Sequence, residues 1–407
     1  MNKIRINKLA NGIRVVCKPL TGLKAITVEV LVGVGSKYEE LGEHGLSHFV
    51  EHMMFKGTLK RPTAEIINKE IDAKGAVSNA GTGQETTSYY VTTVKEHREW
   101  AIELLSDILI YSTFDKKELL KEKVVISEEI KMYQDNPMSG LASDFTKFIW
   151  GGSRIGCWNI SGETEEVLRY EQKDVVDYWR RHYDPNKVVI VMAGDLQGDE
   201  LGLVEDYFSK WNSQDHTPPR IEITWATELD RKIGRKNEQG HFVMGIPGIS
   251  SVDPRKYEFR ILDVVLSGNS SSRLFQKIRE DRGLAYYVYS VSESITEAGV
   301  WAVQSGVVKE KIDEAMDLVK QEILTIGNNL TSDEISRAKE YLRGRTKLAM
   351  DRTDFWTSYL GEKLLLENKL VDIEEELAKI NKVAISGVVG LAKDLVSVNK
   401  LYSLKLV

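Results

Sequence analysis

The sequence has little cysteine, little histidine and no apolar run of membrane-spanning length. Its two cysteines, Cys17 and Cys157, lie too far apart for a metal or redox motif. We interpret them as reduced, structural thiols and expect a bacterial cytoplasmic protein. Apolar runs such as AITVEVLVGVG, from Ala25, fall well short of the roughly 20 residues of a transmembrane helix and predict buried strands. We therefore expect no membrane association.

The sequence also lacks a leader pattern and an excess of positive charge. Its first residues, MNKIRINKLANGIRVVCKPL, contain no apolar core or cleavage site of a secretory signal and predict a β-hairpin that turns at Asn11-Gly12. The formal net charge is -6 and the pI is about 5.8, which argue against a nucleic-acid-binding face. The length of 407 residues favours two or more domains.

Strand and helix patterns alternate along the chain, which predicts an α+β fold. Extended runs occur near residues 25–35, 76–93, 187–194, 239–247, 284–306 and 397–406. Helical periodicity marks EHREWAIELLSDILIYS and KKELLKEKVVISEEIKMY. We expect each domain to hold a mostly antiparallel sheet packed with helices.

The two halves of the chain resemble each other. Each closes with an Asn-Lys turn before a strand, at Asn186-Lys187 and at Asn399-Lys400. The stretch SQDHTPPRIEIT between the halves is polar and holds paired prolines. We predict two tandem homologous domains, 1–213 and 225–407, joined by a linker at 214–224.

One helical segment, GLSHFVEHMMFKG, concentrates histidine in a chain that has only seven. His48 and His52 are four residues apart, so on a helix both imidazoles lie on one face and can reach one metal ion. Glu51 lies beside that face and could act on a water at the metal without being a ligand. We interpret His44 as a helix-start residue. Two histidines satisfied within a core are the alternative explanation.

A second helix supplies carboxylates. Glu122 and Glu129 lie two turns apart on one face of KEKVVISEEIKMY. A carboxylate buried in such a face is costly unless it pairs or binds a metal. The alternative, a solvated charged face, suits Glu118 and Glu128 better. Two histidines, one carboxylate and an open position make the ligand set of a catalytic rather than a structural zinc site.

His48-x-x-Glu51-His52 is an inverted zincin motif, and Glu129 follows His52 after 76 residues. With Glu122 seven residues before Glu129, this pattern resembles the pitrilysin family of zinc peptidases, in the branch of mitochondrial processing peptidase and its bacterial relatives. The resemblance extends over nearly the whole chain, through NAGTGQETTSYY, GGSRIGCWNISGETEEV and SSRLFQKIREDRGLAYYVYS.

The resemblance implies a role for each residue of the motif. His48, His52 and Glu129 would bind one Zn2+ per chain, since the second half carries no HxxEH. Glu51 would be general base and acid, and Glu122 would orient a ligand imidazole from the outer shell.

In the second half the resemblance implies two hydrogen-bond donors that close over the substrate. Tyr286 would reach the oxyanion and Arg279 the substrate carbonyl. Arg282, Tyr287 and Tyr289 are rival candidates. Without the resemblance, Arg279 and Tyr286 are an ordinary surface arginine and a strand tyrosine.

The segment KGAVSNAGTGQETTSYYVTTV predicts a strand edge to which an extended peptide could add. Through the resemblance we expect the backbone of Asn79 and Ala80 to bind the peptide. An ordinary paired hairpin is the alternative.

Together these features predict a zinc endopeptidase that cleaves small peptides or extended, presequence-like segments inside a chamber. Chains of this length in the family form half of a clamshell, so we expect a homodimer, with a heterodimer including an inactive relative left open. The alternative function is a catalytically silent or partner-dependent structural or assembly subunit. A zinc-stabilised binding protein would need a closed site of four ligands, and only three good ligands are present.

Overall fold

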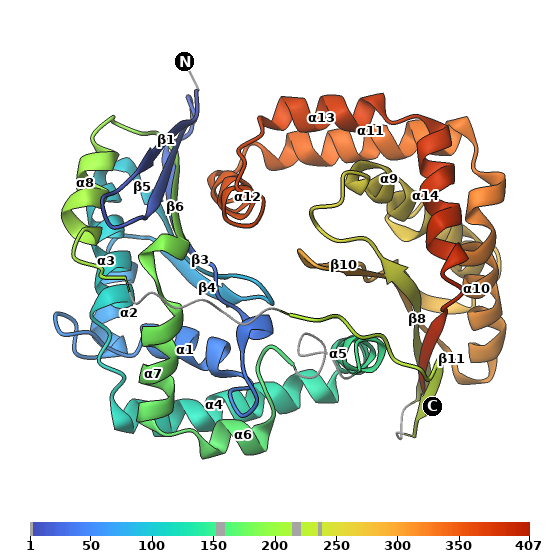
Figure 1. Ribbon diagram of the computed structural model, residues 1–407, viewed down its shortest axis with the longest axis horizontal. Helices are drawn as coiled ribbons and strands as arrows, with labels where there is room; N and C mark the ends of the chain where they lie inside the picture. Colours follow the sequence, from blue (N-terminus) through green and yellow to red (C-terminus); the bar gives the residue numbers. More distant parts are fainter. Residues whose placement is uncertain (1–2, 152–158, 214–220, 235–237) are drawn as a thin grey trace. The chain divides into compact units, whose positions relative to one another are not determined.

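The computed structural model describes residues 3–151, 159–213, 221–234 and 238–407, which form two compact units (Figure 1). Unit 1 comprises Met1–Ile130, Trp158–Arg220 and Ala349–Leu370. Unit 2 comprises Lys131–Cys157, Ile221–Leu348 and Val371–Val407. Most of the predicted linker, and Cys157, lie outside the described residues. Within the described residues, no helix is both long enough and apolar enough to cross a membrane.

Unit 1 is built on a six-stranded sheet in the order β1-β2-β6-β3-β5-β4. The β2–β6 pair is parallel and the other pairs are antiparallel. Its strands are β1 (Arg5–Lys8), β2 (Arg14–Pro19), β3 (Ala25–Val32), β4 (Val77–Thr82), β5 (Thr87–Val94) and β6 (Val188–Gly194). Its helices are α1 (Leu46–Met54), α2 (Ala64–Ala73), α3 (Arg98–Ile110), α4 (Lys116–Asp135), α6 (Thr164–Arg169), α7 (Gln172–His182), α8 (Glu200–Phe208) and α12 (Thr353–Leu366), with short helices η1 (Ser36–Tyr38), η2 (Lys95–His97) and η3 (Pro185–Lys187).

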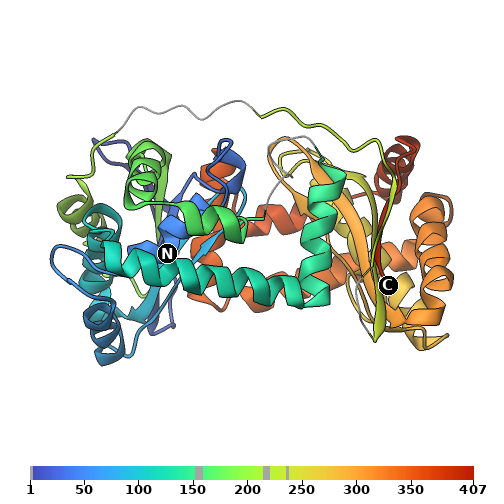
Figure 2. The same ribbon diagram turned by 90° about the horizontal axis from the view of Figure 1, so that it is seen from below.

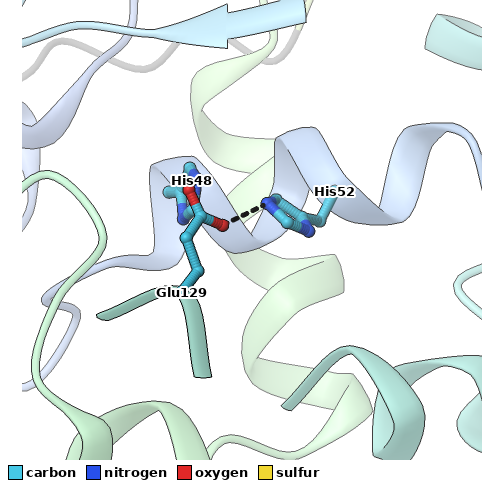
Figure 3. Close-up of side chains that lie close together, drawn as sticks. All are labelled: His48, His52 and Glu129. Carbon is cyan, nitrogen blue, oxygen red and sulfur yellow. Dashed lines mark ion pairs between the residues drawn. The ribbon is translucent and has the colours of Figure 1, made fainter. Parts of the chain in front are cut away.

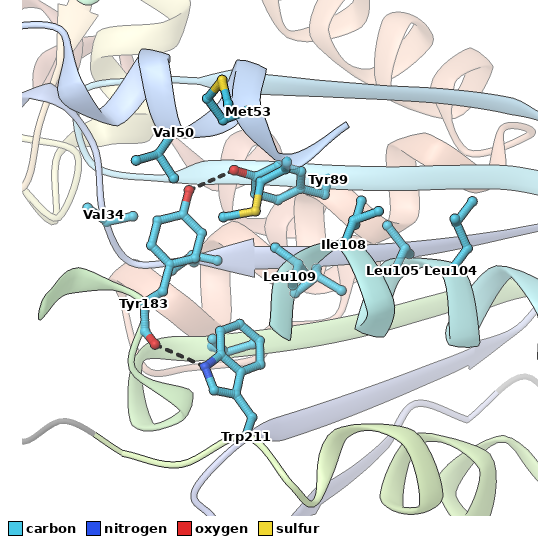
Figure 4. Packing of buried hydrophobic residues seen from close by; sticks show 14 of the residues in the cluster. Val34, Val50, Met53, Tyr89, Leu104, Leu105, Ile108, Leu109, Tyr183 and Trp211 are labelled. Carbon is cyan, nitrogen blue, oxygen red and sulfur yellow. Dashed lines mark hydrogen bonds between the residues drawn. The ribbon is translucent and has the colours of Figure 1, made fainter. Parts of the chain in front are cut away.

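One face of this sheet and the helices α1, α3 and α7 enclose the main core of unit 1. Figure 4 shows Tyr89 of β5 and Tyr183, whose hydroxyls lie 2.6 Å apart, among aliphatic side chains of α1 and α3. The Trp211 Nε1–H donates to the Tyr183 carbonyl at 3.0 Å. Because the polar atoms of these large rings are paired, their hydrogen bonds offset the cost of removing them from water.

The opposite face of the same sheet is covered by α12, a helix from the C-terminal half of the sequence. The strand β3 is therefore buried on both faces, which explains its nearly continuous apolar run. Glu29 is its one acidic residue, and its Oε2 accepts hydrogen bonds from Thr357 Oγ1 at 2.6 Å and Ser358 Oγ at 3.0 Å. Gly361 lets α12 approach closely, because an added Cβ would lie 2.3 Å from Leu31 Cδ1.

Unit 2 contains a second six-stranded sheet, in the order β10-β11-β8-β12-β7 with β9 also paired to β11. Its strands are β7 (Asp230–Ile233), β8 (Gln239–Gly248), β9 (Ala285–Ser290), β10 (Glu293–Ser294), β11 (Gly299–Val308) and β12 (Tyr402–Leu406). Its helices are α5 (Pro137–Ile149), α9 (Lys256–Ser267), α10 (Ile312–Asn329), α11 (Ser332–Ala349), α13 (Ile373–Lys382) and α14 (Ile385–Ser397), with the π-helical η4 (Phe275–Glu280) and the short η5 (Lys309–Lys311).

Unit 2 is also completed by a helix from the other half of the sequence. The helix α5 packs on β8, β11 and β12, and Figure 2 shows it beside these strands. The Gln304 Nε2–H donates to the Met138 carbonyl at 2.7 Å, and Phe148 meets Tyr402 edge to face. On the other face, α9, α10 and α14 enclose the second core.

The predicted α+β fold with two mostly antiparallel sheets is confirmed. The two sheets share one topology, since β2-β6-β3-β5 of unit 1 corresponds in order and direction to β7-β12-β8-β11 of unit 2. The hairpin at Asn11-Gly12 is present, with Gly12 at a φ of 101°. The division at 214–224 stays a prediction, although the compact units also take α5 and α12 from opposite halves of the chain.

Candidate metal centre

The helix α1 carries the histidine motif. It begins after Gly45, whose φ of 87° suits glycine, and whose added Cβ would lie 2.6 Å from the Ser161 carbonyl oxygen. The buried Glu39 accepts hydrogen bonds from the backbone N–H groups of Gly45 and Ser47, at 2.9 and 2.8 Å. Ser47 Oγ also lies 2.7 Å from Tyr178 Oη of α7. The start of the helix is thus held from two sides.

The spacing of apolar residues in α1 sets the direction of its histidines. Phe49, Val50 and Met53 are fully buried in the core of unit 1. His48 and His52 therefore share another face, with ring centroids 4.5 Å apart (Figure 3). This is the arrangement predicted from the four-residue spacing.

The helix α4 faces these histidines. Asp115 Oδ1 accepts from the backbone N–H of Lys117 at 2.8 Å and so stabilises its first turn. Ile126 and Ile130 anchor the helix in the core. The same side of α4 presents two glutamates that lie two turns apart, Glu122, which is buried, and Glu129, whose side chain is 25% exposed.

The ligand atoms of His48, His52 and Glu129 lie within 4.8 Å of one another, and this is the metal-ligand group found in the described part of the chain. Nε2 of His48 is 3.8 Å from Glu129 Oε1, and Nε2 of His52 is 3.4 Å from Glu129 Oε2 (Figure 3). Ligands at about 2.1 Å from a tetrahedral zinc lie roughly 3.4 Å apart. The donor set and its spacing therefore fit zinc.

Burial and charge adjust the two histidines differently. Burial, with the neighbouring His52, lowers the pKa of His48 to about 3, so its imidazole is neutral and free to bind a metal. Burial also acts to lower the pKa of His52, but the hydrogen bond to Glu122 and the nearby carboxylates outweigh it and raise that pKa. Around His52 the protein has thus gathered negative charge, as a cation site requires.

Glu122 contacts the ring nitrogen of His52 that faces away from Glu129. The Nδ1–H of His52 donates to Glu122 Oε2 at 3.0 Å, while Glu122 Oε1 accepts from Lys56 Nζ at 2.7 Å. Burial acts to raise the pKa of Glu122, but its contacts with His52 and Lys56 lower it overall. In the neutral ring this contact places the proton on Nδ1, so Nε2 keeps its lone pair for a metal. Lys56 was not singled out from the sequence, although it follows His52 by four residues.

Glu51 lies on α1 beside the histidines and is hydrogen-bonded to the sheet. Thr82 Oγ1, at the end of β4, donates to Glu51 Oε2 at 2.8 Å. Burial raises the pKa of Glu51, and the hydrogen bond from Thr82 opposes that rise. Thr82 was also missed in the sequence, because strand alternation shows only that it shares a side with Ala80, not which helix that side meets.

Asn79 and Ala80 lie in the middle of β4, at the edge of the sheet in unit 1. Within the described residues, β4 pairs with β5 on one side only. Asn79 is exposed and Ala80 is half-buried. Edge strands leave alternate backbone N–H and C=O groups unpaired, so this strand can accept another.

Arg279 and Tyr286 belong to unit 2, where they flank the turn at Gly283, which has a φ of 60°. Arg279, in η4, is exposed and lies over the Phe275 ring at 5.0 Å. Tyr286, in β9, has 58% of its surface exposed.

The three rival residues are engaged within unit 2. Arg282 pairs with Glu314 at 3.7 Å. Tyr287 Oη lies 3.0 Å from His241 Nδ1, and Tyr289 donates to Gln304 at 3.4 Å. The exposed Tyr286 is freer to meet a ligand than Tyr287 or Tyr289, whereas Arg279 and Arg282 are both exposed. Their assignment stays a prediction.

His44 is directed away from the metal-ligand group. Its Nδ1 lies 2.8 Å from Glu166 Oε2 of α6. This position, one residue before Gly45, agrees with its interpretation as a helix-start residue.

The sequence of the chain matches known proteins over nearly its whole length. Residues 14–150 match the sequence model described as "Insulinase (Peptidase family M16)", and residues 170–342 match "Peptidase M16 inactive domain". An uncharacterized zinc protease of Bacillus subtilis, YmxG, is 33% identical over 387 residues, which cover 95% of this chain and 94% of the relative. The chain belongs to the insulinase family of peptidases. An uncharacterized zinc protease of Streptomyces coelicolor is 30% identical, over 96% of this chain and 87% of its own length.

Solved structures share the fold of this chain. A crystal structure of a protease from Helicobacter pylori superposes with a TM-score of 0.91 at 20% identity, covering 100% of this chain and 99% of that one. A chain of Complex III2 from Candida albicans gives a TM-score of 0.85 at 17% identity, covering 99% of this chain and 96% of that chain. The predicted family membership is confirmed.

Proposed function

We propose that the chain is a zinc endopeptidase that cleaves small peptides or extended, presequence-like segments. The observation that carries this proposal is the cluster of His48, His52 and Glu129 with Glu51 beside it. The names of the bacterial relatives as zinc proteases add support. One Zn2+ per chain is proposed, because these residues form one ligand set.

In this mechanism His48, His52 and Glu129 would hold the metal. Zinc bound there would supply Lewis acidity, which makes a water more acidic and a peptide carbonyl more electrophilic. Glu51 takes the proton of the attacking water on its carboxylate and passes it to the leaving amine. Glu122 keeps the His52 ring oriented by accepting its Nδ1–H.

The substrate would be held by main-chain contacts. An extended peptide adds to the free edge of β4 at Asn79 and Ala80, which gives affinity with little dependence on sequence. Arg279 and Tyr286 would donate to the substrate carbonyl and to the developing oxyanion, in their own chain or in a partner. A homodimer enclosing a chamber is part of the proposal, because the chain carries both the metal ligands and the Arg/Tyr pair. We propose a bacterial cytoplasmic location, with reduced cysteines as its support.

The second candidate is a partner-dependent or silent assembly subunit of the same family. The similarity in fold to a chain of Complex III2 favours it. The complete set of His48, Glu51, His52, Glu122 and Glu129 speaks against loss of the chemistry.

The deciding experiment is cleavage of a quenched, unstructured basic peptide by the purified protein, before and after zinc is removed and restored. We expect activity to disappear with zinc and to return with it. Glu51→Gln should lower kcat by about 10²–10⁴-fold while zinc still binds stoichiometrically. Zinc uptake by the wild type without cleavage of any such peptide would favour the assembly subunit.

A further inference from the structure

The hydrogen bond between Thr82 and Glu51 joins two parts of the proposed site. Thr82 is the last residue of β4, the edge strand, and Glu51 lies on α1 next to His52. Within the described residues, the Glu51 carboxylate is held by a hydrogen bond from Thr82, whose Oγ1 lies 2.8 Å from Glu51 Oε2. Thr82 is half-buried, so its hydroxyl is partly shielded from competing water.

This contact restricts a flexible side chain. A glutamate has three rotatable side-chain bonds, and without a partner its carboxylate samples many orientations. Threonine is β-branched and stiff at χ1, and here it stands on a paired strand. A hydroxyl on such a support fixes one carboxylate oxygen and leaves the other, Oε1, to accept a proton.

We propose that Thr82 is a positioning residue that holds the Glu51 carboxylate in the orientation for proton transfer. The inference rests on the proposed peptidase function and deepens it, because β4 is also the strand proposed to bind the peptide. Within the described residues β4 pairs with β5 alone, so a peptide added to its free edge would restrict Thr82 further, and through it Glu51. Binding of an extended substrate and orientation of the general base are then linked through one hydroxyl.

The test compares Thr82→Val, which keeps the shape and removes the hydroxyl, with Thr82→Ser, which keeps the hydroxyl. We expect Thr82→Val to lower kcat about 10–100-fold with KM changed less than about threefold, because misorientation affects the chemical step. Thr82→Ser should return kcat to within about threefold of the wild type. Zinc affinity, measured by competition with a chromophoric chelator, should be the same in all three proteins.

The matched control is Thr92→Val, on the neighbouring strand β5. Its hydroxyl lies 2.8 Å from Thr27 Oγ1, on the face of the sheet that carries α12. We expect this variant to lose some stability but to keep the wild-type kcat. An unchanged kcat in Thr82→Val, a loss confined to KM, or a Thr82→Ser variant as slow as Thr82→Val would each overturn the inference.

A structural measurement separates this inference from the peptidase function itself. In a crystal structure of the zinc-loaded Thr82→Val variant, we expect the Glu51 carboxylate to be rotated away from its wild-type position. An unmoved Glu51 would refute the positioning role even if the wild type is an active peptidase. A wild type that binds zinc but cleaves nothing would instead refute the proposed function, and with it the role of Thr82 in orienting Glu51 for proton transfer.

Discussion

His52 has a carboxylate at each of its two ring nitrogens. Glu122 binds Nδ1 from the buried side and Glu129 lies 3.4 Å from Nε2 on the ligand side. The first contact fixes the ring and its tautomer, and the second brings a negative charge to the place of the metal. Because Glu122 is itself paired with Lys56, its orientation does not depend on the metal.

Glu122→Gln is expected to weaken zinc binding about 10–100-fold, because the amide no longer accepts as strongly from His52 and cannot pair with Lys56. The measurement is a competition titration with a chromophoric chelator. The control is Glu118→Gln, one turn earlier on α4, which removes only a surface pair with Lys121. Equal zinc affinity for Glu122→Gln and Glu118→Gln would show that the buried contact does not act on the metal.

The sequence identifies the proposed metal ligands and the proposed general base better than the residues that hold them in place. A histidine pair at helical spacing indicates one shared face, and the structure brings Glu129 to that face from α4. Lys56 and Thr82 could not be inferred, because their roles depend on how a helix end and a strand end meet other elements. Assignments that came from the resemblance alone, such as Arg279 and Tyr286, are still predictions.

At the scale of elements, α12 has a surface adapted to the sheet it covers. Thr353 Oγ1 lies 2.7 Å from Thr27 Oγ1, and Gly361 opens space for Leu31. These polar and small residues explain why α12 shows little apolar periodicity in the sequence. Strands and hairpins were predictable from alternation and turn residues, whereas the partner of a helix such as α12 has no local signal.

Gly361→Ala is expected to destabilise the protein by about 1–3 kcal/mol, because the new methyl group overlaps Leu31, which is buried. Gly344→Ala is the matched control, since an added Cβ within α11 meets nothing within 4 Å. That variant should gain about 0.5–1 kcal/mol from better helix propensity. Denaturant unfolding measures both changes. A gain in stability for both variants would show that α12 can move away from β3 at no cost.

The buried Glu29 makes stability depend on pH. Burial raises its pKa from 4.5 to about 7, against the hydrogen bonds from Thr357 and Ser358, and the nearby Glu362 and Asp354 add to the rise. Between these pH values the folded protein holds a proton that the unfolded chain has lost. The protonated Glu29 carboxyl therefore makes its full contribution to the free energy of unfolding below about pH 4.5. This contribution disappears as the pH rises through about 7.

Glu29→Gln should remove this part of the pH dependence, because the amide stays neutral and still accepts from a hydroxyl. We expect the fall in unfolding free energy between pH 5 and pH 8 to be smaller than in the wild type by the order of 1–3 kcal/mol. Glu65→Gln, which removes an exposed carboxylate paired with Lys69, should leave the fall unchanged. Identical pH dependence in all three proteins would mean that Glu29 is ionised when folded.

At the scale of the whole molecule, the chain passes between its two compact units five times, after Ile130, Cys157, Arg220, Leu348 and Leu370. Composition and internal similarity indicated two α+β domains, because each half carries its own pattern of strands. They could not indicate that α5 packs on the sheet of unit 2 and α12 on the sheet of unit 1. Each half has the same order of strands and helices in its sequence whichever sheet these two helices cover.

A fragment of residues 1–213 is expected to be less stable than unit 1 in the intact chain by several kcal/mol. It lacks α12, whose Trp356, Leu360 and Leu364 are buried. The fragment is compared with a second protein, in which residues 1–213 are joined through a Gly/Ser linker to residues 349–370 and so regain α12. Thermal unfolding and binding of a hydrophobic dye should show a cooperative transition for the joined protein and an exposed apolar surface for the fragment. Equal stability of the two proteins would contradict a structural role for α12.

The late position of α12 has a consequence during synthesis on the ribosome. The last strand of the sheet in unit 1 ends at Gly194, but α12 begins only at Thr353. At about 5–20 residues per second, the roughly 160 intervening residues take on the order of 10–30 s to translate. For that time the nascent sheet offers an uncovered apolar face, so a chaperone bound to the growing chain is expected to stay until α12 has emerged.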